Sequence, residues 1–127
     1  MECLTLVVCP SVQLLKAPRR IVGSDRSLLH SPNCEQARIH LAGADISVVI
    51  CEGTLPDGNW KDILKCAAQT KNAPSLIVTS NHADEALWAE VLNLGGYDVL
   101  AQPLDDDEVL RVLASAARTT DISKPRV

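Results

Sequence analysis

The sequence predicts a doubly wound α/β domain built around a five-stranded parallel sheet, with helices on both faces. Short apolar runs rich in valine, isoleucine and leucine alternate with amphipathic helical patterns. Nearly continuous apolar runs are typical of strands covered on both faces, as in a parallel sheet. Alternation of strands and helices is typical of doubly wound folds. Four runs are clear and one is weaker: residues 4–8, 46–50, 75–79 and 97–100, and then residues 27–30.

Capping residues and a proline delimit the helices of the first half. A first helix is predicted after the first strand, and Pro18 should end or kink it because proline cannot continue a helix. Asn33 can cap a second helix over residues 34–42, and Asn59 can cap a third over about residues 60–71. Each of these helices connects two predicted strands, as the fold requires.

Similar signals delimit the helices of the second half. The next helix opens at Asn81 or Ala83 and ends at the glycine pair 95–96, since glycine is common just beyond a helix. Asp105 caps the last helix, with Glu108 three residues later as in a capping box. The strand–helix alternation therefore continues to the end of the domain.

Length, composition and charge bound the class of protein. The 127 residues suit one domain, which we place at 1–118, with a tail or the start of a linker at 119–127. The net charge of −4 argues against direct nucleic-acid binding, which favours a basic face. We expect no secretory signal and no membrane helix, because the sequence has neither a charged leading segment nor an apolar run near ~20 residues.

The cysteines favour a reducing compartment. Their number is odd, and no pair has the CxxC spacing of a zinc or redox motif. They are Cys3, Cys9, Cys34, Cys51 and Cys66. We therefore expect a cytoplasmic protein with reduced thiols, no metal site and no cofactor.

Three segments of the chain resemble response-regulator receiver domains. Residues 48–58 (Val-Val-Ile-Cys-Glu-Gly-Thr-Leu-Pro-Asp-Gly) resemble the third strand and following loop of that bacterial family, and residues 77–80 (Ile-Val-Thr-Ser) its fourth strand. Residues 94–104 (Leu-Gly-Gly-Tyr-Asp-Val-Leu-Ala-Gln-Pro-Leu) are similar to its Gly-Ala…Lys-Pro-Phe segment. The resemblance covers about residues 4–118 and implies a flavodoxin-like sheet of order 2-1-3-4-5.

The resemblance also assigns roles to residues at the carboxyl ends of the strands. Where the family has the aspartate that accepts a phosphoryl group, this chain has Glu52. Cys9 and Pro10 occupy the positions of the acidic pair that holds Mg²⁺, and Gln102 that of a lysine. The hydroxyl residue of the fourth strand is retained as Thr79. The pocket is therefore a degenerate form of the family's phosphoacceptor site.

These differences predict a pocket without the family's phosphorylation chemistry. Phosphoryl transfer needs cationic charge near the developing anion, and Gln102 brings none. Mg²⁺ prefers oxygen ligands, which the side chains of Cys9 and Pro10 lack. Glu52 is one methylene longer than aspartate, and a misplacement of about 1 Å can cost a hundredfold in a positioned reaction.

Three interpretations of Glu52 stay open. Its carboxylate mimics a phosphorylated aspartate, or it binds a different small ligand or ion, or it serves structure in a retired pocket. In the last case, which we favour, it hydrogen-bonds to Thr79, Gln102 or loop amides. Because side chains alternate along a strand, Cys51 should then face the covering helices.

The favoured function is a signalling domain that contacts a partner without phosphate control and is not an enzyme. Val99 replaces the aromatic switch residue of the family's fifth strand, and we expect Trp88 and Tyr97 near an interaction surface. The partner is expected to be another protein or a linked output domain, and a homodimer is a further alternative. The competing hypothesis is a phosphoacceptor that uses Glu52 with an unorthodox metal arrangement. A different α/β enzyme ranks last, since no glycine-rich loop follows the first strand.

Overall fold

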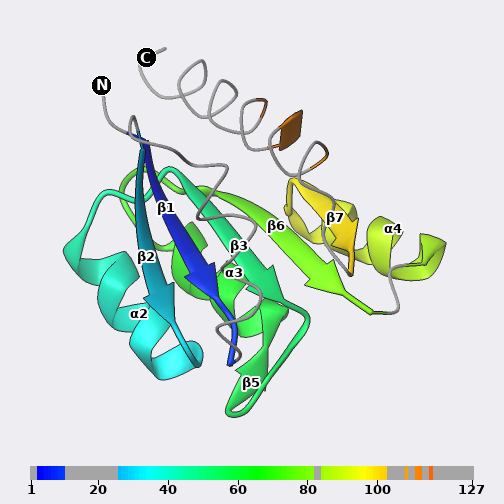
Figure 1. Ribbon diagram of the computed structural model, residues 1–127, viewed down its shortest axis with the longest axis horizontal. Helices are drawn as coiled ribbons and strands as arrows, with labels where there is room; N and C mark the ends of the chain where they lie inside the picture. Colours follow the sequence, from blue (N-terminus) through cyan, green and yellow to red (C-terminus); the bar gives the residue numbers. More distant parts are fainter. Residues whose placement is uncertain are drawn as a thin grey trace.

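The computed structural model describes residues 3–10, 26–81, 84–102, 108, 111–112 and 115. Within these residues, five strands form one parallel sheet of order β2-β1-β3-β6-β7 (Figure 1). The strands are β1 Cys3–Val8, β2 Arg26–Ser31, β3 Val48–Glu52, β6 Ser75–Ser80 and β7 Asp98–Ala101. Counted along these five strands the order is 2-1-3-4-5, which confirms the predicted topology.

Two strands begin later than predicted. β3 starts at Val48 rather than residue 46, and β7 starts at Asp98 rather than residue 97. The residues just before these strands are already hydrogen-bonded to the sheet. The Ser47 amide donates to the Leu4 carbonyl at 2.8 Å, and the Tyr97 amide donates to the Leu76 carbonyl at 2.7 Å. The apolar runs in the sequence therefore begin slightly before the strands, because they include residues that lead into the hydrogen-bonded ladder.

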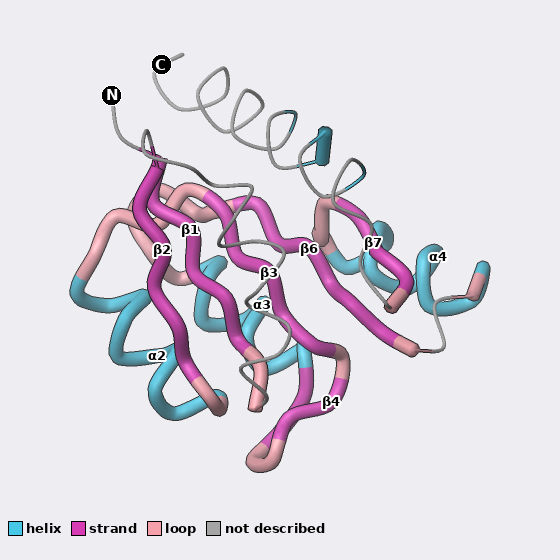
Figure 2. Tube along the Cα trace, viewed as in Figure 1, coloured by secondary structure: helices cyan, strands magenta, loops and turns pink. Residues whose placement is uncertain are grey.

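A short antiparallel hairpin follows β3 and was not predicted. It consists of β4 Thr54–Leu55 and β5 Gly58–Asn59, joined by a turn at Pro56 and Asp57 (Figure 2). Strands of two residues are too short to show a hydrophobic period, so only the Pro-Asp-Gly turn signal marks them in the sequence.

The described helices are α2 Cys34–Gly43, α3 Trp60–Ala68 and α4 Glu85–Leu94. Asn33 and Asn59 cap α2 and α3 as predicted, and Asn59 forms a capping box with Asp62. The cap of α4 is Asp84, whose carboxylate accepts from the Leu87 amide at 2.9 Å. The prediction of Asn81 or Ala83 was wrong. Alanine has no side-chain acceptor, and Asn81, although asparagine caps as well as aspartate, lies three residues before the cap position.

The glycine pair ends α4 as the sequence predicts. Gly95 adopts a left-handed backbone with φ of 107°, which costs glycine little. The Gly96 amide then donates to the Val91 carbonyl at 2.8 Å, which satisfies one of the last carbonyls of the helix. The chain reverses here and enters β7.

Helices α2 and α3 cover one face of the sheet, and Figure 2 shows them behind the strands. Leu6, Val49 and Val78 pack there with Leu41 of α2 and Ile63 of α3. Alternate residues of the same strands are also buried toward the opposite face: Thr5, Val7, Val48, Ile50, Ile77 and Thr79. Burial on both faces explains why the apolar runs are nearly continuous.

The first and the last of the predicted helices fall largely outside the described residues. The first was expected soon after Pro10, and the last from Asp105, as was the tail at 119–127. Only Glu108, Arg111, Val112 and Ser115 of the last helix are described, and all four are helical. The described helices include none that is long and apolar enough to cross a membrane.

Candidate functional site

The predicted pocket residues lie at the carboxyl ends of β1, β3, β6 and β7, which share one edge of the parallel sheet. In doubly wound sheets this edge is where ligands bind. Register places Glu52 of β3 directly beside Thr79 of β6. Gln102 follows β7 by one residue, so three of the predicted side chains belong to neighbouring strands.

Thr79 and Gln102 are in direct contact. The Thr79 side chain is fully buried, and Gln102 Nε2 donates to Thr79 Oγ1 at 3.0 Å. The Gln102 amide also donates to the Ser80 carbonyl at 3.0 Å, while the Gly53 amide donates to the Thr79 carbonyl at 2.9 Å. The ends of β3, β6 and β7 are therefore tied together around the threonine hydroxyl.

Glu52 lies beside this contact without joining it. Its side chain is half-buried, and within the described ranges no hydrogen bond or ion pair reaches its carboxylate. The neighbouring Cys51 faces the other way, into the core formed with α2 and α3, as alternation predicts. Burial raises the pKa of the Cys51 thiol well above its usual value, so this thiol stays protonated and acts as a packing group.

Cys9 and Pro10 stand at the end of β1 with different surroundings. The Cys9 side chain is fully buried, whereas Pro10 is exposed. The Cys9 backbone is bound to β2, because its amide donates to the Ser31 carbonyl at 3.0 Å and its carbonyl accepts from His30 Nε2 at 2.8 Å. Across the described parts of the chain, no group of three His, Cys, Asp or Glu side chains is arranged to hold a metal ion.

The three residues predicted at an interaction surface do not behave alike. Trp88 belongs to α4, a helix that lies beside β7 (Figure 1), and 50% of its surface is exposed. Val99 is partly buried and packs against the core. Tyr97 is also partly buried, and its hydroxyl hydrogen-bonds to the Ser115 hydroxyl. Trp88 is therefore the residue of this group that is open to a partner.

Asp57 is an important contact that sequence reasoning missed. From the β4–β5 turn, its carboxylate accepts from the Cys34 amide at 2.8 Å and the Glu35 amide at 3.1 Å. These bonds, led by the one from Cys34, lower the pKa of Asp57. Burial and the adjacent Asp57 carboxylate raise the pKa of the Cys34 thiol to about 12. The turn therefore holds the N-terminus of α2, although only a turn signal is visible in the sequence.

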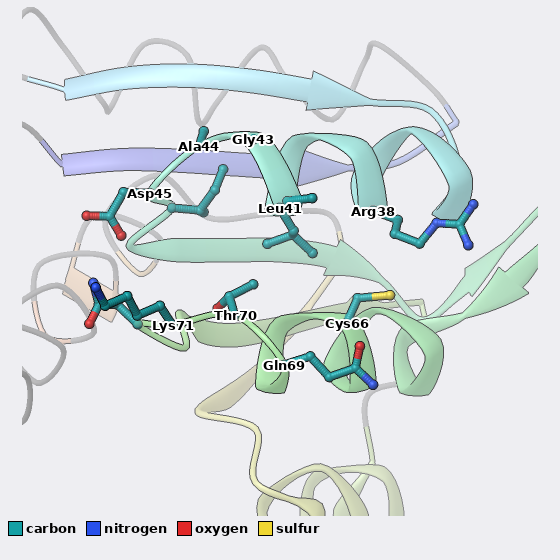
Figure 3. Close-up of a pocket in the computed structure, with 12 residues that line it drawn as sticks. Arg38, Leu41, Gly43, Ala44, Asp45, Cys66, Gln69, Thr70 and Lys71 are labelled. Atoms are coloured by element: carbon teal, nitrogen blue, oxygen red, sulfur yellow. The ribbon is translucent and has the colours of Figure 1, made fainter.

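A cavity in the described part of the chain lies away from the predicted pocket. It has a volume of about 610 Å³ and lies between the C-terminal ends of α2 and α3. Figure 3 shows Arg38 at one end and Asp45 and Lys71 at the other, with Leu41 between them. Its loops lead into the amino ends of β3 and β6, so the cavity lies at the sheet edge opposite to Glu52.

Comparison with known sequences gives one relevant curated relative. No protein-family model matches the chain. The chain is 32% identical over 82 residues to the transcriptional regulatory protein FixJ of Bradyrhizobium diazoefficiens. The match covers 64% of this chain and 40% of that relative, so the chain spans well under half of its length.

Solved structures give a likeness over nearly the whole chain. The signal receiver domain of an HD domain-containing protein from Pseudomonas fluorescens has a TM-score of 0.86 and 23% identity, covering 97% of this chain and 100% of that one. A CheY-like receiver domain protein from Methanospirillum hungatei has a TM-score of 0.83 and 13% identity, covering 96% and 98%. These likenesses confirm the resemblance that three sequence segments indicated: the chain has the fold of response-regulator receiver domains.

Proposed function

We propose that this receiver-like domain works in two-component signalling as a protein-interaction module that needs no phosphoryl group. The observation that carries the proposal is the hydrogen bond from Gln102 Nε2 to Thr79 Oγ1 at 3.0 Å. By the resemblance, a lysine and a free hydroxyl would stand at these two positions to meet a phosphoryl group. Here the neutral carboxamide of Gln102 stands in place of the lysine, and the Thr79 hydroxyl already accepts a hydrogen bond from it.

The charge at this edge of the sheet supports the same conclusion. Glu52 brings a carboxylate, and its neighbours Thr79 and Gln102 are neutral. A phosphoryl anion about 4 Å from a carboxylate is opposed by about 4 kcal/mol per pair of unit charges at an effective dielectric of 20. A lysine and metal-bound carboxylates would offset that repulsion, and the sequence offers Gln102, Cys9 and Pro10 in their places.

The proposed output is a surface contact. Trp88 exposes half of its side chain on α4, and aromatic side chains are enriched at protein interfaces. We propose that a separate protein or a linked output domain binds there. Val99 fits this role because a small aliphatic residue at this position does not rotate between two environments as an aromatic ring can. The domain thus acts by binding and catalyses no reaction.

The test is phosphorylation by a small phosphodonor. The chain is incubated with acetyl phosphate and Mg²⁺ beside a receiver domain known to accept phosphate, and both are analysed by intact mass spectrometry. We expect the added mass of a phosphoryl group on the reference domain and none on this chain. A phosphorylated form that is absent from the Glu52→Gln variant would overturn the proposal, because it would make Glu52 a phosphoacceptor.

A further inference from the structure

Acidic residues are concentrated in one part of the chain. Residues 72–110 contain eight acidic side chains and no lysine or arginine, while the other positions hold all twelve basic residues and eight acidic ones. The eight are Asp84, Glu85, Glu90, Asp98, Asp105, Asp106, Asp107 and Glu108. The segment that includes β6, α4 and β7 is therefore strongly negative, although the whole chain carries only −4.

One face of α4 combines this charge with exposed apolar surface. Trp88 is 50% exposed and Leu92 is 37% exposed, and their spacing of four residues places them side by side. Asp84 and Glu85 precede Trp88 by four and three residues, so they lie on the same face one turn earlier. We call Asp84, Glu85, Trp88 and Leu92 the acidic–aromatic face.

The third acidic residue of this helix segment, Glu90, has a partner within the protein. Glu90 pairs with Lys61 of α3 at 2.8 Å, so its charge is partly compensated within the protein. Within the described residues, no such ion pair reaches Glu85. The Asp84 carboxylate caps the helix and keeps its negative charge near the surface. The acidic–aromatic face thus retains negative charge beside Trp88.

We propose that the acidic–aromatic face binds a basic amphipathic segment of a partner protein. Lysine or arginine side chains complement Asp84 and Glu85, and a cation can also stack on the Trp88 ring. Apolar residues of the segment would pack on Trp88 and Leu92, as in other helix-in-groove or helix-face contacts. This inference rests on the proposed function, because it names the partner chemistry of the same surface.

The same charges argue against other occupants. Nucleic acids and anionic membrane surfaces are polyanions, so a negative face repels them. A second copy of the chain would place two acidic–aromatic faces opposite each other, which charge complementarity disfavours. A basic amphipathic protein segment complements both the negative charge and the exposed apolar surface of this face.

The experiment uses the full chain and a labelled synthetic peptide of leucine and lysine, about 14 residues long, which forms an amphipathic helix of about four turns. Binding is followed by fluorescence anisotropy at about 0.05 M and about 0.5 M salt, because salt screens exposed charges. A peptide with glutamate in place of lysine is the ligand control. We expect saturable binding of the lysine peptide, weakened at high salt, and none of the glutamate peptide.

Matched variants locate the binding surface. Trp88→Ala and Glu85→Lys should each weaken binding about tenfold, the loss expected for a central interface residue. The controls lie on α2: Ile39→Ala removes a side chain that is 57% exposed, and Glu35→Lys reverses a first-turn charge. Circular dichroism confirms that all four variants are folded. Equal weakening by the α2 variants, or none by the α4 variants, would overturn the assignment.

Two further outcomes separate this inference from the proposed function. Binding that requires beryllofluoride and Mg²⁺ would support the basic segment but contradict phosphate independence. A lack of binding with or without beryllofluoride would overturn the inference and leave the proposal about the pocket standing. A last measurement is sedimentation velocity of the chain alone. A dimer of the wild-type chain that becomes monomeric in the Trp88→Ala variant would overturn the inference, because it would assign the acidic–aromatic face to a second copy of the chain.

Discussion

Gln102 and Thr79 show how one substitution changes the chemistry of the site. The glutamine replaces the lysine that the resemblance implies, and its carboxamide reaches a hydroxyl that is fully buried. A buried hydroxyl needs a hydrogen-bond partner, and Gln102 supplies one from the neighbouring strand. Gln102 therefore brings no positive charge to the site and, at the same time, supplies a hydrogen-bond partner for the buried Thr79 hydroxyl.

The strength of this contact can be measured by a double-mutant cycle with Thr79→Val and Gln102→Ala. Each single variant loses the hydrogen bond, so we expect a coupling energy of about 1 kcal/mol between the two positions. Urea unfolding of the four proteins gives the free energies. A control cycle pairs Thr79→Val with Thr70→Val, whose hydroxyl donates to the Ala67 carbonyl on the other side of the fold. Additive effects of Thr79→Val and Gln102→Ala would contradict the described contact.

At the scale of elements, the β4–β5 hairpin and α2 depend on each other. Asp57 of the turn accepts two amide hydrogens from the first turn of α2, where the helix dipole also favours negative charge. Gly58 follows in close contact, since a Cβ at that position would lie 2.4 Å from Asp62 Oδ2 and 3.0 Å from Cys34 Sγ. The hairpin therefore connects the first turns of α2 and α3.

This contact predicts a pH-dependent contribution to stability. The pKa of Asp57 is lowered in the folded protein, mainly by the Cys34 amide, so the folded state holds the ionised form more tightly than the unfolded state does. The contribution is complete above the ordinary aspartate pKa and is lost as the pH falls through the lower folded pKa. We expect Asp57→Asn to be less stable than the wild type near pH 7, with a gap that closes in acid.

Urea unfolding over a series of pH values measures this gap. Glu35→Gln is the control. It neutralises an exposed carboxylate in the same helix turn, and no described hydrogen bond reaches that carboxylate. Because this substitution removes no described hydrogen bond, its effect on stability near pH 7 should be smaller than that of Asp57→Asn. A gap for Asp57→Asn that stays open or widens below the ordinary aspartate pKa would contradict the assigned role of the carboxylate.

At the scale of the whole molecule, the fold was predictable because its signals are local and repeated. Each strand of the sheet is a short apolar run, and residues 4–8 and 75–79 coincide closely with β1 and β6. The cap at Asn59 and the glycine pair 95–96 likewise act on neighbouring residues only. The order of the strands in the sheet was predicted from the resemblance to receiver domains. That resemblance rests on three sequence segments whose separations match those of the family.

The contacts that shape the site were not predictable in the same way. Gln102 and Thr79 are 23 positions apart, and so are Asp57 and Cys34. Such pairs become neighbours only after the strands take their order in the sheet. The sequence therefore indicated which residues occupy the carboxyl edge, while the structure supplied which of them bind each other. The prediction of Asn81 or Ala83, where Asp84 is the cap of α4, failed at a helix boundary, where several residues that can cap stand close together.

The central claim concerns the whole domain: a receiver fold that does not respond to phosphate. Its most direct test is an amide NMR titration with Mg²⁺ and then with beryllofluoride plus Mg²⁺, which mimics an acyl phosphate on a competent carboxylate. We predict no shifts around Glu52, Thr79 and Gln102 and none on α4. Saturable shifts that begin at Glu52 and spread to α4 and β7 would contradict the account and restore phosphate-driven switching.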